Sequence, residues 1–308
     1  METSEILNRL QSIVGAENVK TKEPMSSHIT FRAGGPADFF VTPESSEQIA
    51  GVVAFAKDAG IPYFVLGNGS NLLVGDLGIR GIVIQLLDSF SDVSFTEAGG
   101  FLVRAQAGAK LSKIGNECVR KGAAGFECLA GIPGSVGGAV RMNAGAYGSE
   151  VKDCLVTARV LTQDGEVKEL SAEELELSYR HSIVEEKGYI VLEAVFALGK
   201  GNPAEIKAKM RDLMGRRRDK QPLEYASAGS TFKRPEGHFA GQLIEEAGLK
   251  GFAIGDACVS EKHAGFVVNK GHATAEEIVG VIEAVTKKVQ ETSGVTLHKE
   301  VRFTGEFK

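Results

Sequence analysis

Two glycine-rich segments hold the residues best suited to bind an anionic group. Residues 67–71 follow a short apolar run, and the second segment spans residues 131–148. Glycine permits positive φ values and leaves space for a ligand, so several backbone N–H groups can converge on one phosphate. Neither segment matches a Rossmann G-x-G-x-x-G or a P-loop G-x-x-x-x-G-K-[ST]. Tight turns in a β-rich domain are the alternative, and the first segment alone would favour it. Two such segments together favour an anion-binding role.

The composition excludes several classes of protein. Net charge is -5 from 35 Lys+Arg and 40 Asp+Glu, so no strongly basic surface for a nucleic acid is expected. Residues 1–20 lack a signal-peptide core and no run of 18 apolar residues occurs, which predicts a cytoplasmic protein without a membrane segment. The cysteines form no CxxC pair and lie at no metal-ligand spacing, so we expect reduced thiols and no metal site.

The helices and strands that must position these segments are predicted from hydrophobic periodicity and from capping and turn residues. Capping-box spacing occurs at Ser45 with Gln48 and at Thr274 with Glu277, and Asp164-Gly165 predicts a hairpin turn. Helices are expected after Thr3-Ser4 and over residues 46–59, 111–121, 204–217, 239–247 and 275–292. Strands are expected over residues 37–41, 62–66, 81–86, 101–107, 155–161, 166–170, 189–198, 265–269 and 295–304.

A domain boundary is predicted near residues 199–203, where two glycines precede an N-cap Asn202 and Pro203. The mixture of strands and helices indicates an α+β protein with a larger, glycine-rich N-terminal part and a smaller C-terminal domain.

Seven blocks of sequence resemble the UDP-N-acetylenolpyruvoylglucosamine reductase (MurB) family, in its shorter class. Four lie in the N-terminal part: TFRAGGPA at 30–37, GNGSNLL at 67–73, GIPGSVGG at 131–138 and NAGAYG at 143–148. Three lie further on: SYRHS at 178–182, AGSTFKRP at 228–235 and LHKEVRF at 297–303. The blocks occur in the family's order between about Met25 and Gly305.

The resemblance implies a fold and a cofactor. It predicts an FAD-binding domain like that of p-cresol methylhydroxylase and vanillyl-alcohol oxidase over residues 1–200, with two subdomains and a core at 33–199. An α+β substrate-binding domain follows over residues 201–308. FAD would be held non-covalently. The residues implied to bind it are Arg32, Gly67, Asn68, Gly69, Ser70, Asn71, Leu72, Ile132, Pro133, Gly134, Ser135, Gly137, Gly138, Asn143, Gly145, Ala146 and Tyr147.

The resemblance also implies a reaction in cytoplasmic peptidoglycan precursor synthesis. NADPH reduces the flavin, which passes a hydride to C3 of UDP-N-acetylglucosamine enolpyruvate. C2 then gains a proton, and UDP-N-acetylmuramate forms. Ser230 matches the family's proton donor, whereas Arg180 and Glu300 match the residues that hold and polarise the enolpyruvyl carboxylate. An arginine fork grips a carboxylate bidentately, which lysine cannot do.

Further candidates would contact the substrate's diphosphate or pack on it: Tyr179, Lys220, Lys233, Arg234, Lys262 and His263. The longer class of the family carries an extra loop with a tyrosine that closes over the substrate. This chain has too few residues between Arg180 and Ser230 for that loop, so its closing residue is not identified. No obligate protein partner is inferred.

Two other functions fit parts of the pattern. An oxidase of the same superfamily would keep the flavin and use O₂, although the C-terminal blocks argue against it. A non-catalytic nucleotide-sugar binder would yield a colourless preparation. Covalent flavin attachment, which some superfamily members form through His or Cys, would involve Cys128 or Cys154.

Overall fold

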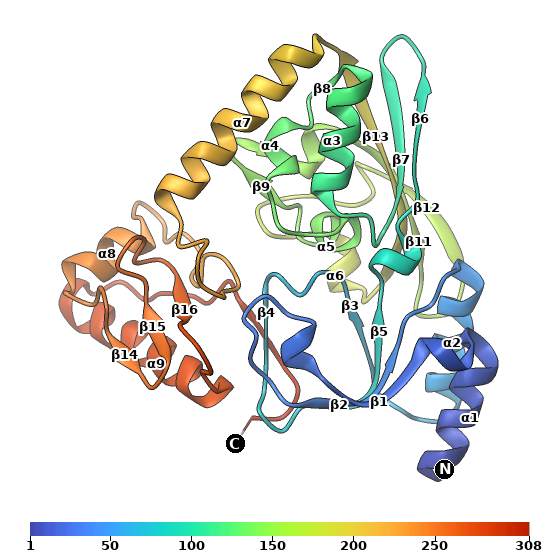
Figure 1. Cartoon of the computed structure of the whole chain (residues 1–308), viewed down its shortest axis with the longest axis horizontal. Helices are drawn as coiled ribbons and strands as arrows, with labels where there is room; N and C mark the ends of the chain where they lie inside the picture. Colours follow the sequence, from blue (N-terminus) through green and yellow to red (C-terminus); the bar gives the residue numbers. More distant parts are fainter. Residues whose placement is uncertain (308) are drawn as a thin grey trace. The chain divides into compact units, whose positions relative to one another are not determined.

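The chain divides into two compact units that each draw on separate parts of the sequence. The computed structural model describes residues 1–307 (Figure 1). The first unit comprises Met1–Lys20, Phe40–Asn68 and Ile82–Arg216, and the second comprises Thr21–Phe39, Gly69–Gly81 and Arg217–Lys308. This division differs from the predicted limits at residues 200 and 201, because two early segments pack with the C-terminal part. The assignment of cofactor and substrate binding to those domains stays a prediction.

An antiparallel sheet forms the centre of the first unit. Its strand order is β12-β11-β13-β7-β6, and β8 also pairs with β13. The strands are β6 (Val93–Glu97), β7 (Phe101–Gln106), β8 (Ala123–Ala124), β11 (Leu155–Leu161), β12 (Val167–Ser171) and β13 (Ile190–Lys200). In β7 the buried Phe101, Val103 and Ala105 alternate with more exposed residues, as expected for a sheet with one covered face. The predicted hairpin is confirmed, with Gly165 at φ 82° between β11 and β12.

Short helices cover one face of this sheet, with α5 packed against β13 and β7 (Figure 1). The helices of the unit are α1 (Thr3–Val14), α2 (Ser46–Asp58), α3 (Leu111–Lys121), α4 (Glu127–Ala130), α5 (Val136–Arg141), α6 (Ile183–Glu186) and most of α7 (Pro203–Lys220). The predicted Ser45 cap of α2 and Asn202 cap of α7 are both present. The hairpin of β9 (Gly145–Ala146) and β10 (Ser149–Glu150) completes the unit.

A second sheet has the order β1-β2-β5-β3, and the division between the units passes through three of its strands. Its members are β1 (Val19–Pro24), β2 (Pro36–Val41), β3 (Tyr63–Leu66) and β5 (Ile79–Gln85). Strand β3 runs parallel to β5 and ends at the first glycine segment. The sequence therefore places that segment at a strand end, as predicted.

The remainder of the second unit packs around its longest helix. The elements are β4 (Leu72–Val74), α8 (Ala240–Glu246), β14 (Ala253–Ile254), β15 (Ala257–Val259), β16 (Val267–Asn269), α9 (Ala275–Ser293) and β17 (Arg302–Thr304). Helix α9 carries the predicted Thr274–Glu277 capping box. Its buried residues include Ile278, Ile282 and Val285, and the helix packs against all three strands of the sheet β14-β15-β16.

The predicted strand over residues 295–304 is wrong for most of its length. Only Arg302–Thr304 forms a strand, which pairs in parallel with β4. Upstream, the backbone bonds to a loop instead: Lys233 N–H donates to the His298 carbonyl, and Glu300 N–H donates to the Thr231 carbonyl. The predicted alternation of apolar and polar residues still agrees with the burial, because Leu297 and Val301 are buried between more exposed neighbours.

Within residues 1–307, no helix combines the length and apolar character needed to cross a bilayer. All four cysteines are free thiols; Cys118 and Cys258 are buried, and Cys128 and Cys154 are half-buried.

Candidate functional site

The first unit contains a buried hydroxyl without a partner at the start of the second glycine segment. Ser135 is 2% exposed, and its Oγ makes no hydrogen bond in the described part of the chain. A Cβ added to Gly67 would lie only 2.4 Å from this oxygen. Glycine at 67 therefore leaves the space that the Oγ occupies beside the end of β3. A phosphate oxygen is a suitable partner for such a donor, so the residues present fit the predicted FAD pyrophosphate.

Some backbone N–H groups in this segment already have partners. The Val136 N–H donates to the Ala109 carbonyl at 2.9 Å, and the Gly137 N–H donates to the Ala107 carbonyl at 2.8 Å. These bonds hold the start of α5 against the chain after β7. A Cβ on Gly137 would lie 3.0 Å from that of Ala107, so glycine at 137 permits close packing there. The Gly137 N–H is therefore engaged within the protein.

The first glycine segment is fixed to the second by Asn68. Its Nδ2 donates to the Pro133 carbonyl at 2.8 Å, which joins the GNGSN and GIPG blocks. The next residue, Gly69, has φ 61° and needs a residue without a side chain: in the second unit, a Cβ there would lie 2.5 Å from the His28 carbonyl oxygen. The two blocks are thus juxtaposed at Asn68 as an anion-binding role requires.

The NAGAYG block forms a hairpin, and its two largest polar side chains bond to the protein. Asn143 is fully buried; its Nδ2 donates to Glu150 Oε2 and the Ser178 carbonyl, and its Oδ1 accepts from the Lys152 N–H. The Tyr147 hydroxyl donates to the Leu213 carbonyl in α7 at 3.2 Å. Cofactor contacts from residues 143–147 stay a prediction, and the Asn143 amide has no remaining donor for one.

Arg180 lies in a strained turn of the first unit. The Ser178 and His181 backbones bond to each other in both directions, at 3.1 and 3.2 Å, with Tyr179 and Arg180 between them. Arg180 has φ 56°, a left-handed conformation that disfavours residues other than glycine. Its guanidinium carbon lies 5.1 Å from the centre of the half-exposed Tyr179 ring, within the range of a cation–π contact. Non-glycine strain of this kind is concentrated at functional sites.

In the second unit, Ser230 and Glu300 are brought together through Thr231. Thr231 is fully buried; its N–H donates to the Gly265 carbonyl, and its Oγ1 accepts from the Val267 N–H. Its carbonyl accepts from the Glu300 N–H at 2.8 Å. Ser230 precedes this fixed residue, is exposed, and follows Gly229 at φ 77°. Ser230 therefore directly precedes a hydrogen-bonded residue whose carbonyl binds the Glu300 N–H.

Asn71 and Arg32, predicted cofactor residues, also belong to the second unit. The Asn71 Nδ2 donates to the Glu300 carbonyl at 3.1 Å, and the Arg302 N–H donates to the Asn71 carbonyl. Arg32 is exposed at φ 55°. Thr30 Oγ1 donates to the Ser227 carbonyl at 2.6 Å, so the TFRAGG block is anchored just before AGSTFKRP.

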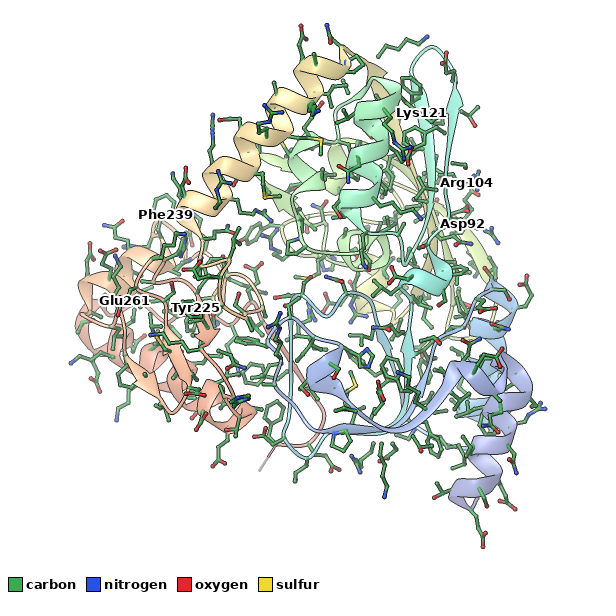
Figure 2. All side chains as sticks on the ribbon, in the orientation of Figure 1. Asp92, Arg104, Lys121, Tyr225, Phe239 and Glu261 are labelled. Atoms are coloured by element: carbon green, nitrogen blue, oxygen red, sulfur yellow. The ribbon has the colours of Figure 1, made fainter. Side chains whose placement is uncertain are left out.

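The candidate substrate cations differ in their surroundings. Arg234 stacks on Phe239, which is labelled in Figure 2, at 4.1 Å from the ring centre. Lys262 Nζ donates to the Arg218 carbonyl at 2.7 Å. The His263 Nδ1 accepts from the Gly265 N–H, and burial lowers the imidazole pKa, so His263 is neutral at pH 7. Lys220 and Lys233 are exposed. Contacts with a diphosphate stay predictions, and a neutral His263 would supply no charge.

Sequence reasoning missed two buried residues that fix the candidate catalytic groups. Thr231 holds the backbone beside Ser230, as described above. Ser182 is fully buried, and its Oγ donates to the Arg141 carbonyl at 2.6 Å. Both are small polar residues inside blocks that carried the resemblance, and that position was the available signal.

Cys128 and Cys154, the two thiols considered for covalent flavin attachment, lie in different environments. Burial raises the pKa of Cys154 to about 12, which leaves almost no nucleophilic thiolate at neutral pH. Cys128 is half-buried in α4. Covalent attachment through Cys154 is therefore disfavoured.

Comparisons with known proteins agree with the arrangement in both parts of the chain. Residues 37–171 match the FAD binding domain family, and residues 221–304 match the family described as UDP-N-acetylenolpyruvoylglucosamine reductase, C-terminal domain. The UDP-N-acetylenolpyruvoylglucosamine reductase of Lachnoclostridium phytofermentans is 51% identical over 302 residues, covering 98% of this chain and 97% of that protein.

Solved structures give the same result. The crystal structure of UDP-N-acetylenolpyruvylglucosamine reductase (MurB) from Thermus caldophilus superposes with a TM-score of 0.77 at 36% identity, covering 92% of this chain and 97% of that one. A VAO-type flavoprotein from Myceliophthora thermophila shares the fold, with a TM-score of 0.51 at 12% identity. The superposition covers 65% of this chain and 48% of that one. The predicted α+β fold class and FAD as cofactor are thereby confirmed, and the chain belongs to the UDP-N-acetylenolpyruvoylglucosamine reductase family.

Proposed function

We propose that this protein reduces UDP-N-acetylglucosamine enolpyruvate to UDP-N-acetylmuramate with NADPH, in the cytoplasm, as a step of peptidoglycan precursor synthesis. The observation that supports the proposal is the hydrogen bond from the Glu300 N–H to the carbonyl of Thr231, the residue after the exposed Ser230, in the domain matched to this family. A reduction of a C=C bond needs a hydride at one carbon and a proton at the other, and the protein must supply the proton.

FAD, held non-covalently, would supply the hydride chemistry that links NADPH to C3 of the enolpyruvyl group. Residues of both glycine blocks would hold it, with Ser135 Oγ donating to a phosphate oxygen beside Gly67. The Asn68–Pro133 bond would keep these blocks in register. The protein's contribution to this part is binding and orientation.

Ser230 would donate its hydroxyl proton to C2 of the substrate. A serine hydroxyl is a weak acid, so it can act only on a strongly basic carbon, such as one that carries negative charge next to a carboxylate. Its presentation from the fixed Thr231 restricts the direction of approach, which allows the proton to reach one face of C2.

Arg180 and Glu300 would stabilise the charge that develops beside C2. Arg180 would bind the enolpyruvyl carboxylate through its guanidinium fork. The Glu300 carboxyl group would donate a hydrogen bond to the developing enolate of the same substrate group. A group that acts on the transition state should affect turnover more than binding. NADPH and substrate would use the same cleft in turn, as the resemblance implies.

The test is anaerobic mixing of NADPH-reduced protein with UDP-N-acetylglucosamine enolpyruvate, followed through the flavin absorbance. Reoxidation with formation of UDP-N-acetylmuramate is expected. Reoxidation only when O₂ is admitted would indicate an oxidase, and a colourless protein that cannot be reconstituted with FAD would indicate a binding protein. Either result would overturn the proposal.

A further inference from the structure

Two buried side chains anchor the Arg180 turn to the second glycine segment, one on each side of it. Before the turn, Asn143 Nδ2 donates to the Ser178 carbonyl at 3.0 Å. After the turn, Ser182 Oγ donates to the Arg141 carbonyl at 2.6 Å. Asn143 and Ser182 are both fully buried, so the two donor side chains are shielded from water. The turn is therefore attached at both ends to the three residues 141–143.

Asn143 is itself held firmly enough to act as an anchor. Its Oδ1 accepts from the Lys152 N–H at 3.0 Å, and its Nδ2 also donates to Glu150 Oε2 at 2.9 Å. It adopts φ 43°, which asparagine tolerates better than most residues. Every donor and acceptor of this amide is thus engaged within the first unit. The side chain fixes the turn and has no donor left for a ligand.

The turn needs such anchoring because its own conformation is unfavourable. Arg180 has φ 56° without the freedom of glycine, and its flanking residues Ser178 and Tyr179 are exposed. A short exposed turn with a strained residue would otherwise relax toward ordinary φ values, which would redirect the guanidinium. The Ser178 carbonyl accepts from both His181 N–H and Asn143, so the anchor and the turn share one atom.

We propose that Asn143 and Ser182 are positioning residues, which hold Arg180 in the orientation needed to bind the substrate carboxylate. The proposal rests on the proposed function, because it gives the anchors a role only through Arg180. Neither anchor needs to contact substrate or cofactor. Loss of the Ser182 hydroxyl should therefore impair the substrate half of the reaction and spare flavin reduction by NADPH.

The experiment uses full-length, FAD-loaded protein and the variants Ser182→Ala and Asn143→Gly. Glycine at 143 retains the positive φ while removing the amide. We expect the second-order rate constant for reoxidation of the reduced flavin by substrate to fall about tenfold to a hundredfold, as for a small misplacement of a catalytic group. In Ser182→Ala, whose residue is not among the predicted cofactor contacts, flavin reduction by NADPH should change less than about twofold. Thr162→Val, which removes a buried side-chain bond to the Glu166 N–H in the same unit, is the matched control and should affect neither half-reaction.

Two further readouts separate positioning from general damage. In the Arg180→Ala background, Ser182→Ala should add almost nothing, because the group that it positions is gone. Amide exchange of residues 178–182 should accelerate in Ser182→Ala and Asn143→Gly relative to wild type, whatever the activity. Additive losses, equal losses in both half-reactions, or unchanged exchange would overturn the proposal. An Arg180→Ala variant with full substrate reduction would instead overturn the role of Arg180 in the proposed function.

Discussion

Removing the Ser135 hydroxyl should weaken FAD binding without destabilising the FAD-free protein. Its Oγ is buried and makes no hydrogen bond within residues 1–307. An unpaired buried polar group costs about 1–3 kcal/mol, so Ser135→Ala should leave the free energy of unfolding of FAD-free protein unchanged or raise it. A hydrogen bond to a charged partner contributes about 1.5–3 kcal/mol, so the Kd for FAD should rise about tenfold to a hundredfold or slightly more.

Ser45 provides a matched control, because it also precedes a helix but its Oγ accepts from the Gln48 N–H at 3.2 Å. Ser45→Ala should cost about 1 kcal/mol of stability, as for a lost N-cap, and leave the Kd for FAD unchanged. Urea unfolding of flavin-free protein followed by circular dichroism measures stability, and quenching of flavin fluorescence measures affinity. If Ser135→Ala behaves like Ser45→Ala, the hydroxyl is a structural cap and the pyrophosphate assignment is wrong.

Four further predictions follow from the structure. Glu300→Gln should preserve flavin reduction by NADPH and slow substrate reduction at least tenfold, as for loss of one transition-state interaction; equal loss in both half-reactions, seen by stopped flow, would contradict this role. Asp76→Ala should cost about 1–2 kcal/mol in urea unfolding, because Asp76 accepts from the Ala275 and Glu276 N–H groups at the start of α9. His263 has a pKa below that of the unfolded chain, so its contribution to stability is lost as pH falls from about 6.5; His263→Gln should flatten the dependence measured between pH 5 and 7. Burial raises the pKa of Cys118 to about 12, so a thiol reagent at pH 8 should label Cys128 well before Cys118, and equal rates would refute this.

Elements with local signals could be predicted from the sequence. Helix α3 has its predicted limits, because its apolar spacing and the following Gly122 at φ 71° define both the helix and its end. The capping box of α9 and the Asp164-Gly165 turn were predicted for the same reason, since each depends on residues close in the chain. The conformational preference of each of these elements depends on interactions between residues only a few positions apart in the sequence.

Features that depend on distant partners could not be predicted. The strand expected over residues 295–304 is interrupted because its backbone pairs with residues 231–233 and with β4, neither of which the local alternation specifies. Two early segments join the C-terminal unit, which no composition change in the chain indicates. The left-handed conformation of Arg180 has no glycine to mark it, and becomes interpretable only when its anchors are seen.

The second glycine segment shows that a motif alone does not distinguish the local environments of its residues. Resemblance placed Ser135 and Asn143 in one group of cofactor contacts, yet one has an unpaired hydroxyl beside Gly67 and the other has every polar atom bonded to protein. Both positions require a particular residue, but for different physical reasons. Ser135, at the start of the segment, can bind an anion because its hydroxyl lacks a hydrogen-bond partner within residues 1–307. Asn143, further along, can position the Arg180 turn because its amide donors are already bonded to protein groups. A single stretch of chain thus links the candidate cofactor contact to Arg180 within one unit. A shift of α5 should therefore affect both FAD affinity and carboxylate binding, whereas a change at Thr231 should affect the roles proposed for Ser230 and Glu300.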